Sequence, residues 1–213
     1  MFSVFSRTLT RRQMAVWCTA LAAALLLSGL HAGLGWARAQ QRTAAALCAD
    51  TLRLHIRADS DSLADQTAKL AVRDAVLAYV DRHCTASTQA DALRWAARNL
   101  TELEWAARSA LARRGIVSTV NVRLVEMYFP TTRYAASALP AGRYQALRLE
   151  LGSNARHGRN WWCVLYPGLC RTACGGYARP EENDLVCGQY VLRFKCVEWW
   201  QQLTARREER VIL

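Results

Sequence analysis

The sequence is poor in lysine and histidine, and its first 39 positions contain no acidic residue. Only two of the 28 basic residues are lysines, and the arginines are dispersed rather than clustered among aromatic residues. A nucleic-acid-binding surface needs such a basic cluster, so the net charge of +11 does not indicate nucleic acid as a partner. The chain also lacks the residues of a P-loop, a serine-triad motif and internal repeats, and it predicts no small-molecule substrate.

The N-terminal segment has the features of a targeting signal. Three arginines at positions 7–12 precede an uncharged apolar run, and Ala37-Arg38-Ala39 follows it. These are the parts of a secretory signal, although the run is also long enough for a membrane anchor. Cleavage after Ala39 and an uncleaved anchor that contacts the membrane through residues 14–36 both remain open. We therefore predict a signal peptide or membrane anchor at 1–39 and one exported domain at 40–213.

Export makes the cysteines informative, because disulfides form and persist outside the cytoplasm. Cys18 lies in the apolar run, which leaves seven cysteines in the exported part, an odd number. Proximity along the chain suggests the pairs Cys48–Cys84, Cys163–Cys170 and Cys174–Cys187, with Cys196 left over. A zinc site made of Cys163, Cys170, Cys174 and Cys187 fits less well, because their spacing lacks the tight pairs of a zinc knuckle. The sequence predicts no metal and no other cofactor.

The periodicity of the apolar residues predicts a single α+β domain. Strands are expected at 52–58, 116–129, 147–151, 161–166 and 190–196, and long helices at Leu63–Arg82 and Ser87–Arg114. We expect a mostly antiparallel sheet of about five strands with both helices on one face. In the first helix, Leu63, Leu70 and Leu77 are expected on one apolar stripe and Val72 and Val76 on the far side, which leaves Lys69 on a narrow polar arc. His55 falls on the polar face of its strand and is expected to be a solvated histidine.

The most informative stretch runs from Asn160 to Cys170 and is Asn-Trp-Trp-Cys-Val-Leu-Tyr-Pro-Gly-Leu-Cys. Its first part suits a strand with two apolar faces, and Pro167-Gly168 ends that strand. Such a strand is covered on both faces, or offers one face to a partner. The stretch closely resembles the signature of the stage II sporulation protein R family.

Other segments resemble the same family in the same order. The run from Ile56 to Tyr79 is similar to the family's N-terminal motif, with Asp59 where the family more usually has Asn. Phe129-Pro-Thr and Pro140-Ala-Gly-Arg-Tyr144 also resemble it. The largest departure is the turn at 152–160, which is longer and poorer in glycine than in relatives.

The resemblance implies an exported developmental signal of endospore-forming bacteria. Such a protein is made in the forespore and enters the space between forespore and mother cell. There it activates a membrane-embedded aspartic protease of the stage II sporulation protein GA type, which cleaves the pro-sequence from pro-sigma-E in the mother cell. On this view the chain is a ligand that binds the protease's active state, not an enzyme.

The candidate partner-binding residues are groups that are hard to bury. They are Asp59 and Asp61 at the start of the first helix, Asn160, and Trp161 or Trp162, whichever is not packed inside. Helix capping is the simpler role for the two aspartates, with Ser62 as part of a capping box.

Two other functions remain open. An exported thiol-dependent or cell-wall hydrolase would use Cys163 as nucleophile and His157 as base. A disulfide between Cys163 and Cys170 would exclude it, because an oxidised sulfur cannot attack. A structural protein of the septum would keep residues 1–39 and leave sigma-factor processing unchanged.

Overall fold

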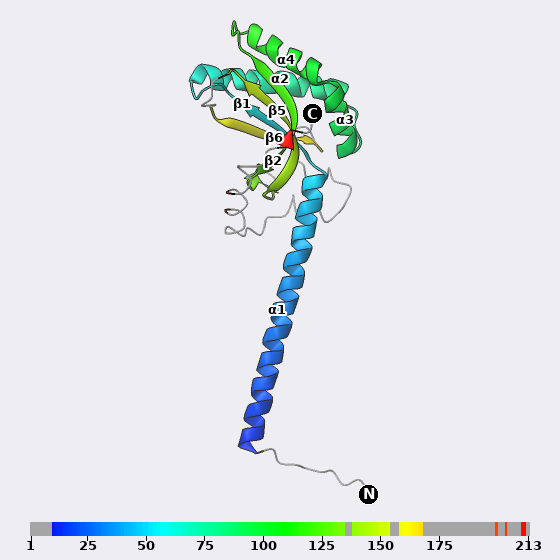
Figure 1. Ribbon diagram of the computed structural model, residues 1–213, viewed down its shortest axis with the longest axis vertical. Coiled ribbons are helices and arrows are strands. Elements are labelled where there is room, and N and C mark those ends of the chain that lie inside the picture. Colours follow the sequence, from blue (N-terminus) through cyan, green and yellow to red (C-terminus); the bar gives the residue numbers. More distant parts are fainter. Residues whose placement is uncertain are drawn as a thin grey trace. The chain divides into compact units, whose positions relative to one another are not determined.

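A computed structural model describes residues 10–134, 138–153, 158–167, 199, 203 and 210–211. The chain divides into two compact units, residues 1–42 and 43–213. This division does not test cleavage after Ala39, which stays a prediction. In chain order the elements are α1 (Arg11–Ala49), β1 (Leu52–Arg57), α2 (Leu63–His83), α3 (Gln89–Arg98), α4 (Leu100–Ala112), β2 (Val120–Phe129), β3 (Thr132–Arg133), β4 (Ala138–Leu139), β5 (Gly142–Leu151), β6 (Asn160–Tyr166) and β7 (Arg210–Val211) (Figure 1).

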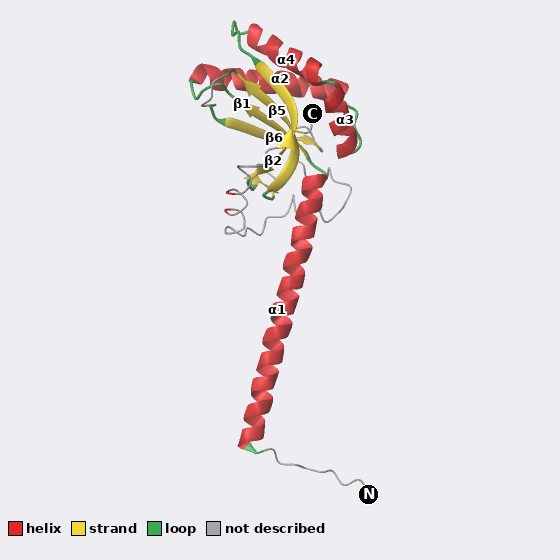
Figure 2. Ribbon diagram, viewed as in Figure 1, coloured by secondary structure: helices red, strands yellow, loops and turns green. Residues whose placement is uncertain are grey.

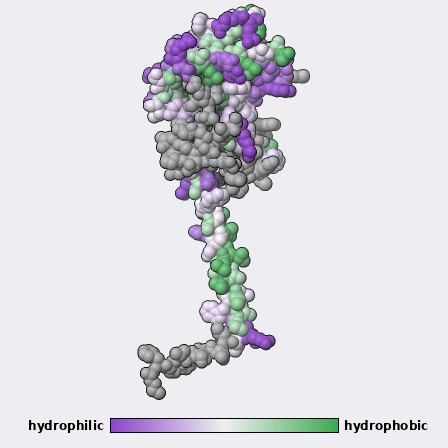
Figure 3. All heavy atoms as spheres, turned by 180° about the vertical axis from the view of Figure 1, so that it is seen from behind, coloured by the Kyte–Doolittle hydropathy of each residue, from purple (hydrophilic) through white to green (hydrophobic). Residues whose placement is uncertain are grey.

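Helix α1 contains the apolar run of the N-terminal segment. Among the described residues it is the one helix long and apolar enough to cross a membrane, and an 18-residue stretch of it has a mean hydropathy of 1.7. Large apolar side chains such as Trp17 and Leu26 are exposed on it, and Figure 3 colours its middle as hydrophobic. Such a helix fits a signal or anchor segment.

The main sheet has the strand order β6-β1-β5-β2-β7 (Figure 2). β1 and β5 are parallel, and the other three neighbouring pairs are antiparallel. The predicted α+β class and the mostly antiparallel five-stranded sheet are therefore confirmed. The fifth strand is β7, whereas the strand expected at 190–196 lies outside the described residues.

Helices α2, α3 and α4 lie together along one face of the sheet, as Figure 1 shows. Leu54, Ile56 and Leu149 of the sheet are fully buried there, together with Val76 of α2 and Leu103 of α4. Side chains alternate along a strand, so the residue between Leu54 and Ile56 and the residues on either side of Leu149 face the opposite side. That opposite face carries a second cluster, which includes Leu47, Cys48, Phe129, Leu139, Tyr144 and Val164.

The predicted second long helix is two helices, because the chain breaks at Asn99. This residue has φ −116° and ψ 20°, and its side-chain Nδ2 donates to the carbonyl oxygen of Trp95 at 2.8 Å. Asparagine competes with the helix by bonding to nearby backbone in this way. α4 therefore starts again at Leu100 with its own direction.

The buried side of α2 is the one that carries Val72 and Val76, and it includes Lys69, which was predicted to lie on a polar arc. Ala68, Val72 and Val76 are buried and so is Lys69, whereas Leu63 is 85% exposed. At about 3.6 residues per turn, the nine positions from Leu63 to Val72 are two and a half turns, so the two side chains lie on opposite faces. Val72 and Val76 pack in the core under the helices, and the expected leucine stripe was wrong at Leu63 and Leu70, which are exposed.

Candidate partner-binding site

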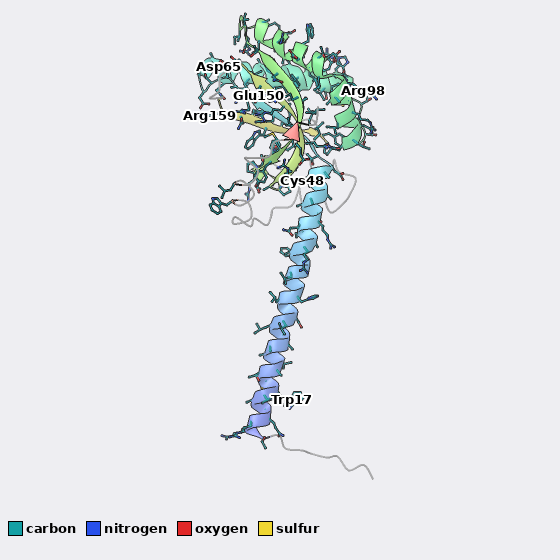
Figure 4. All side chains as sticks on the ribbon, viewed as in Figure 1. Trp17, Cys48, Asp65, Arg98, Glu150 and Arg159 are labelled. Atoms are coloured by element: carbon teal, nitrogen blue, oxygen red, sulfur yellow. The ribbon has the colours of Figure 1, made fainter. Side chains whose placement is uncertain are left out.

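The start of α2 and the chain just before β6 meet at one corner of the domain. The backbone N–H of Arg159 donates to Oδ1 of Asp61 at 2.7 Å, and that of Gly158 donates to the carbonyl oxygen of Ala58 at 2.9 Å. The first of these bonds joins residues 98 positions apart. Figure 4 labels Asp65 and Arg159 at this end of the domain. Two stretches singled out in the sequence thus form one surface.

The first turn of α2 is capped by two serines. The hydroxyl of Ser62 accepts from the backbone N–H of Asp65 at 3.1 Å, which confirms the predicted N-cap. Instead of returning to Ser62, the Asp65 carboxylate accepts from the Ser60 hydroxyl, whose oxygen accepts from the Ser62 N–H at 3.1 Å. The loop before the helix is therefore held in one conformation, and neither Asp59 nor Asp61 is its N-cap residue.

Lys69 connects this loop to the chain before β6. Its Nζ donates to Oε1 of Gln66 at 2.6 Å and to the carbonyl oxygen of Arg159 at 2.9 Å. Nε2 of Gln66 in turn donates to the carbonyl oxygen of Ser60 at 2.8 Å. Lys69 is only 5% exposed, and burial lowers the pKa of its ammonium group, an effect that the Asp61 carboxylate opposes.

Two glycines allow the segments to approach this closely. Gly152 has φ +77°, and a Cβ there would lie 2.0 Å from Cγ of Asp59. A Cβ on Gly158 would lie 2.0 Å from the carbonyl oxygen of Ser60. Both distances are far below van der Waals contact, so any side chain would force the segments apart. The turn at 152–160 therefore needs glycine at these two places.

The corner brings together part of the predicted set. Asp61 has a 63% exposed side chain, and Asn160 is exposed directly after Arg159. Asp59 is half-buried and packs against Gly152. A partner can therefore reach Asp61 and Asn160, whereas Asp59 supports the loop.

The two tryptophans point to opposite faces of the sheet and both are half-buried. Trp161 packs against the core under the helices, with the guanidinium of Arg73 5.2 Å from its ring centroid. The ring centroid of Trp162 lies 5.8 Å from that of Phe129 and 6.3 Å from that of His55. Neither ring is free of packing, so neither is singled out as the contact residue.

The face of the sheet opposite the helices contains polar groups that are buried, which the sequence did not predict. His55 is 2% exposed, so its prediction as a solvated histidine was wrong. Burial lowers the pKa of His55 to about 3. The side chain of Asn160 opposes this shift, and the positive charge of Arg148 adds to it. Arg53 is fully buried, with Nη2 2.8 Å from the Tyr134 hydroxyl. Its guanidinium lies 4.1 Å from the Phe129 ring centroid, a cation–π contact.

The described residues test one of the three predicted cysteine pairs. Cys48 and Cys84 are both free thiols, so that predicted disulfide is wrong: Cys48 packs in the second cluster and Cys84 under the helices, on opposite faces of the sheet. Cys163 is disulfide-bonded, and its pairing with Cys170 stays a prediction. Cys170, Cys174, Cys187 and Cys196 lie outside the described residues.

The described residues do not support the thiol-hydrolase alternative. The sulfur of Cys163 is in a disulfide and cannot serve as a thiolate nucleophile, and its proposed base His157 lies outside the described residues. Within the ranges that the structure describes, no three His, Cys, Asp or Glu side chains are grouped to hold a metal ion.

Sequence reasoning missed Lys69 as a residue of the site. A signal was present, because 26 of the 28 basic residues are arginines and a lysine is therefore unusual in this chain.

Comparison with known proteins agrees with the resemblance seen in the sequence. The family model described as stage II sporulation protein R matches residues 48–175. Stage II sporulation protein R of Bacillus subtilis (strain 168) is 34% identical over 165 residues, which are 75% of this chain and 73% of that protein. No solved structure shows a significant match.

Proposed function

The chain belongs to the stage II sporulation protein R family and is a sporulation signalling protein, and from this premise we propose that it activates a membrane-embedded aspartic protease. The protease is of the stage II sporulation protein GA type and cleaves pro-sigma-E in the mother cell. The chain acts from outside the forespore, in the space between the two membranes. The apolar helix α1 supports export or membrane association.

The observation that carries this proposal is the joining of two distant motifs at one corner. The backbone bond between Arg159 and Asp61 fixes a surface on which Asp61 and Asn160 are exposed. A surface that is ordered before binding loses less entropy when a partner docks. A ligand of this kind activates by binding the active state of the protease more tightly than the inactive state.

The test is reconstitution in growing, non-sporulating cells. We would co-produce this chain with the membrane-embedded protease and pro-sigma-E of the same organism, and follow the sigma factor's size by immunoblot. The proposal is supported if pro-sigma-E is shortened only when this chain is present, and if the shortening is lost when residues 1–39 are deleted. Pro-sigma-E that stays full length, with all three proteins present and this one exported, refutes it.

A pair of variants tests the surface. The double variant Asp61→Ala, Asn160→Ala should reduce processing while export continues, because both residues are exposed. Asp81→Asn is the matched control, since it changes an exposed carboxylate at the far end of α2. Equal processing by the double variant and the control would show that the partner binds elsewhere.

A further inference from the structure

Lys69 is the buried charged side chain of the corner, and its position is unusual. It is 5% exposed on α2, although a lysine is rarely buried unless its ammonium group is bonded to acceptors. Both of its described acceptors are neutral oxygens, the side-chain amide of Gln66 and the carbonyl of Arg159. The other buried residues of α2 are alanine and valine, so packing alone does not require a lysine at this position.

The two acceptors belong to the two halves of the surface. Gln66, in the first turn of α2, also donates to the carbonyl oxygen of Ser60, so it is bonded to the loop that carries Asp61. Arg159 immediately precedes the exposed Asn160. Lys69 therefore connects the loop before α2 to the start of β6 on the buried side. The bond between the Arg159 N–H and Asp61 connects them at the surface.

A lysine suits this position better than an arginine. Its ammonium group is compact and can direct separate donors to two acceptors, whereas a planar guanidinium needs more room. Burial lowers the pKa of Lys69 and the Arg159 guanidinium adds to this shift, while the nearby Asp61 carboxylate opposes it.

From this geometry we infer that Lys69 is the positioning residue of the partner-binding surface. It holds the start of β6 against the loop before α2, so that Asn160 and Asp61 are presented together. Lys69 itself does not touch the partner. The inference rests on the proposed function for its effect on processing, but the bridge itself can be measured without the protease.

The first measurement is hydrogen exchange of the purified full chain in detergent. In Lys69→Met, the amides of Gly158 and Arg159 should exchange roughly tenfold or more faster, because their bonds to Ala58 and Asp61 lose support. The amides of Leu147 and Leu149 in β5 should keep their rates. A residue with only a general structural role would accelerate both sets.

The second measurement is pro-sigma-E processing in the reconstituted cells. Lys69→Met should be exported like the natural chain and should lower processing roughly tenfold or more, whereas Asp81→Asn should not. Gln66→Met removes the other end of the bridge and should act in the same direction. It also serves as the test if Lys69→Met is not exported.

The outcomes separate the inference from the proposed function. Unchanged exchange at residues 158–159, or faster exchange with normal processing, overturns the positioning role. Faster local exchange with reduced processing supports it. If the natural chain itself gives no processing, the proposed function fails, and the positioning role for a partner fails with it, even where exchange shows that the bridge exists.

Discussion

Glu150 offers the most direct test of the buried charges on the face opposite the helices. Its carboxylate accepts from Nη2 of Arg148 at 2.6 Å, from Nη1 of Arg57 at 3.3 Å, and from Nη2 of Arg123. The Arg148 side chain is 6% exposed and that of Glu150 is 12% exposed, so this pair is largely desolvated. Glu150→Gln keeps the shape but removes the charge.

The expected loss of stability is about 3 kcal/mol. Breaking a buried ion pair costs about 3–5 kcal/mol, because the remaining charge stays buried. The amide oxygen of glutamine retains part of the hydrogen bonding, which places the value at the low end of that range. Arg57 and Arg123 are 26% and 34% exposed and each add at most about 1 kcal/mol. For a folded unit of residues 43–213, about 3 kcal/mol corresponds to a melting temperature roughly 6–12 °C lower.

The effect should depend on pH with a definite sign. Burial raises the pKa of Glu150, but the guanidinium groups of Arg148 and Arg123 outweigh burial and hold the pKa below its ordinary value of 4.5. The carboxylate therefore stabilises the fold above about pH 4.5, and this contribution is lost as the pH falls through the folded-state pKa. The difference in unfolding free energy between the natural chain and Glu150→Gln should be largest at neutral pH and shrink on acidification.

The assay is thermal unfolding followed by circular dichroism between pH 3 and pH 7. Glu126→Gln is the control, because Glu126 pairs with Arg143 at 2.7 Å while both side chains are about one-third exposed. We expect it to cost less than about 1 kcal/mol. The reasoning is refuted if the two variants melt alike, or if the Glu150→Gln difference is the same at pH 3 and pH 7.

Two further predictions concern the thiols and α2. Iodoacetamide should label the half-buried Cys84 of the native chain and spare Cys48, because burial raises the pKa of Cys48 to about 11; equal labelling in peptide mass spectra would contradict this. Val72→Ala should lower the free energy of unfolding in urea by about 2–3 kcal/mol, since Val72 is fully buried, whereas Leu63→Ala should change it by less than about 0.5 kcal/mol. The reverse order would restore the leucine stripe expected from the sequence.

The elements of the fold could be predicted because apolar side chains recur in them at the regular spacing of a strand or a helix. The alternation of Leu52, Leu54 and Ile56 with polar residues gave β1, and the capping serine gave the start of α2. The break at Asn99 was missed because the helical period on either side of it continues almost in phase. It depends on one side chain bonding to the backbone of Trp95.

Burial of polar groups could not be predicted in the same way. Alternation shows that His55 and Arg53 share the polar face, but it does not show that this face is covered. Likewise, α2 has two plausible apolar stripes, and only packing against the sheet selects the one that buries Lys69. The candidate residues Asp61 and Asn160 were chosen separately, and their nearness follows from the pairing of β1 with β6.

The bond between Arg159 and Asp61 also bears on when the surface can exist. Closing a chain segment of 98 residues costs roughly 4 kcal/mol of entropy, which is offset only once β6 has paired with β1. A chain that is still passing through the membrane, or that stops before β6, has the loop before α2 but not the strand that completes it. The surface that presents Asp61 and Asn160 together therefore forms only after β6 has been exported and has paired with β1. A chain whose export is interrupted before that point has no such surface.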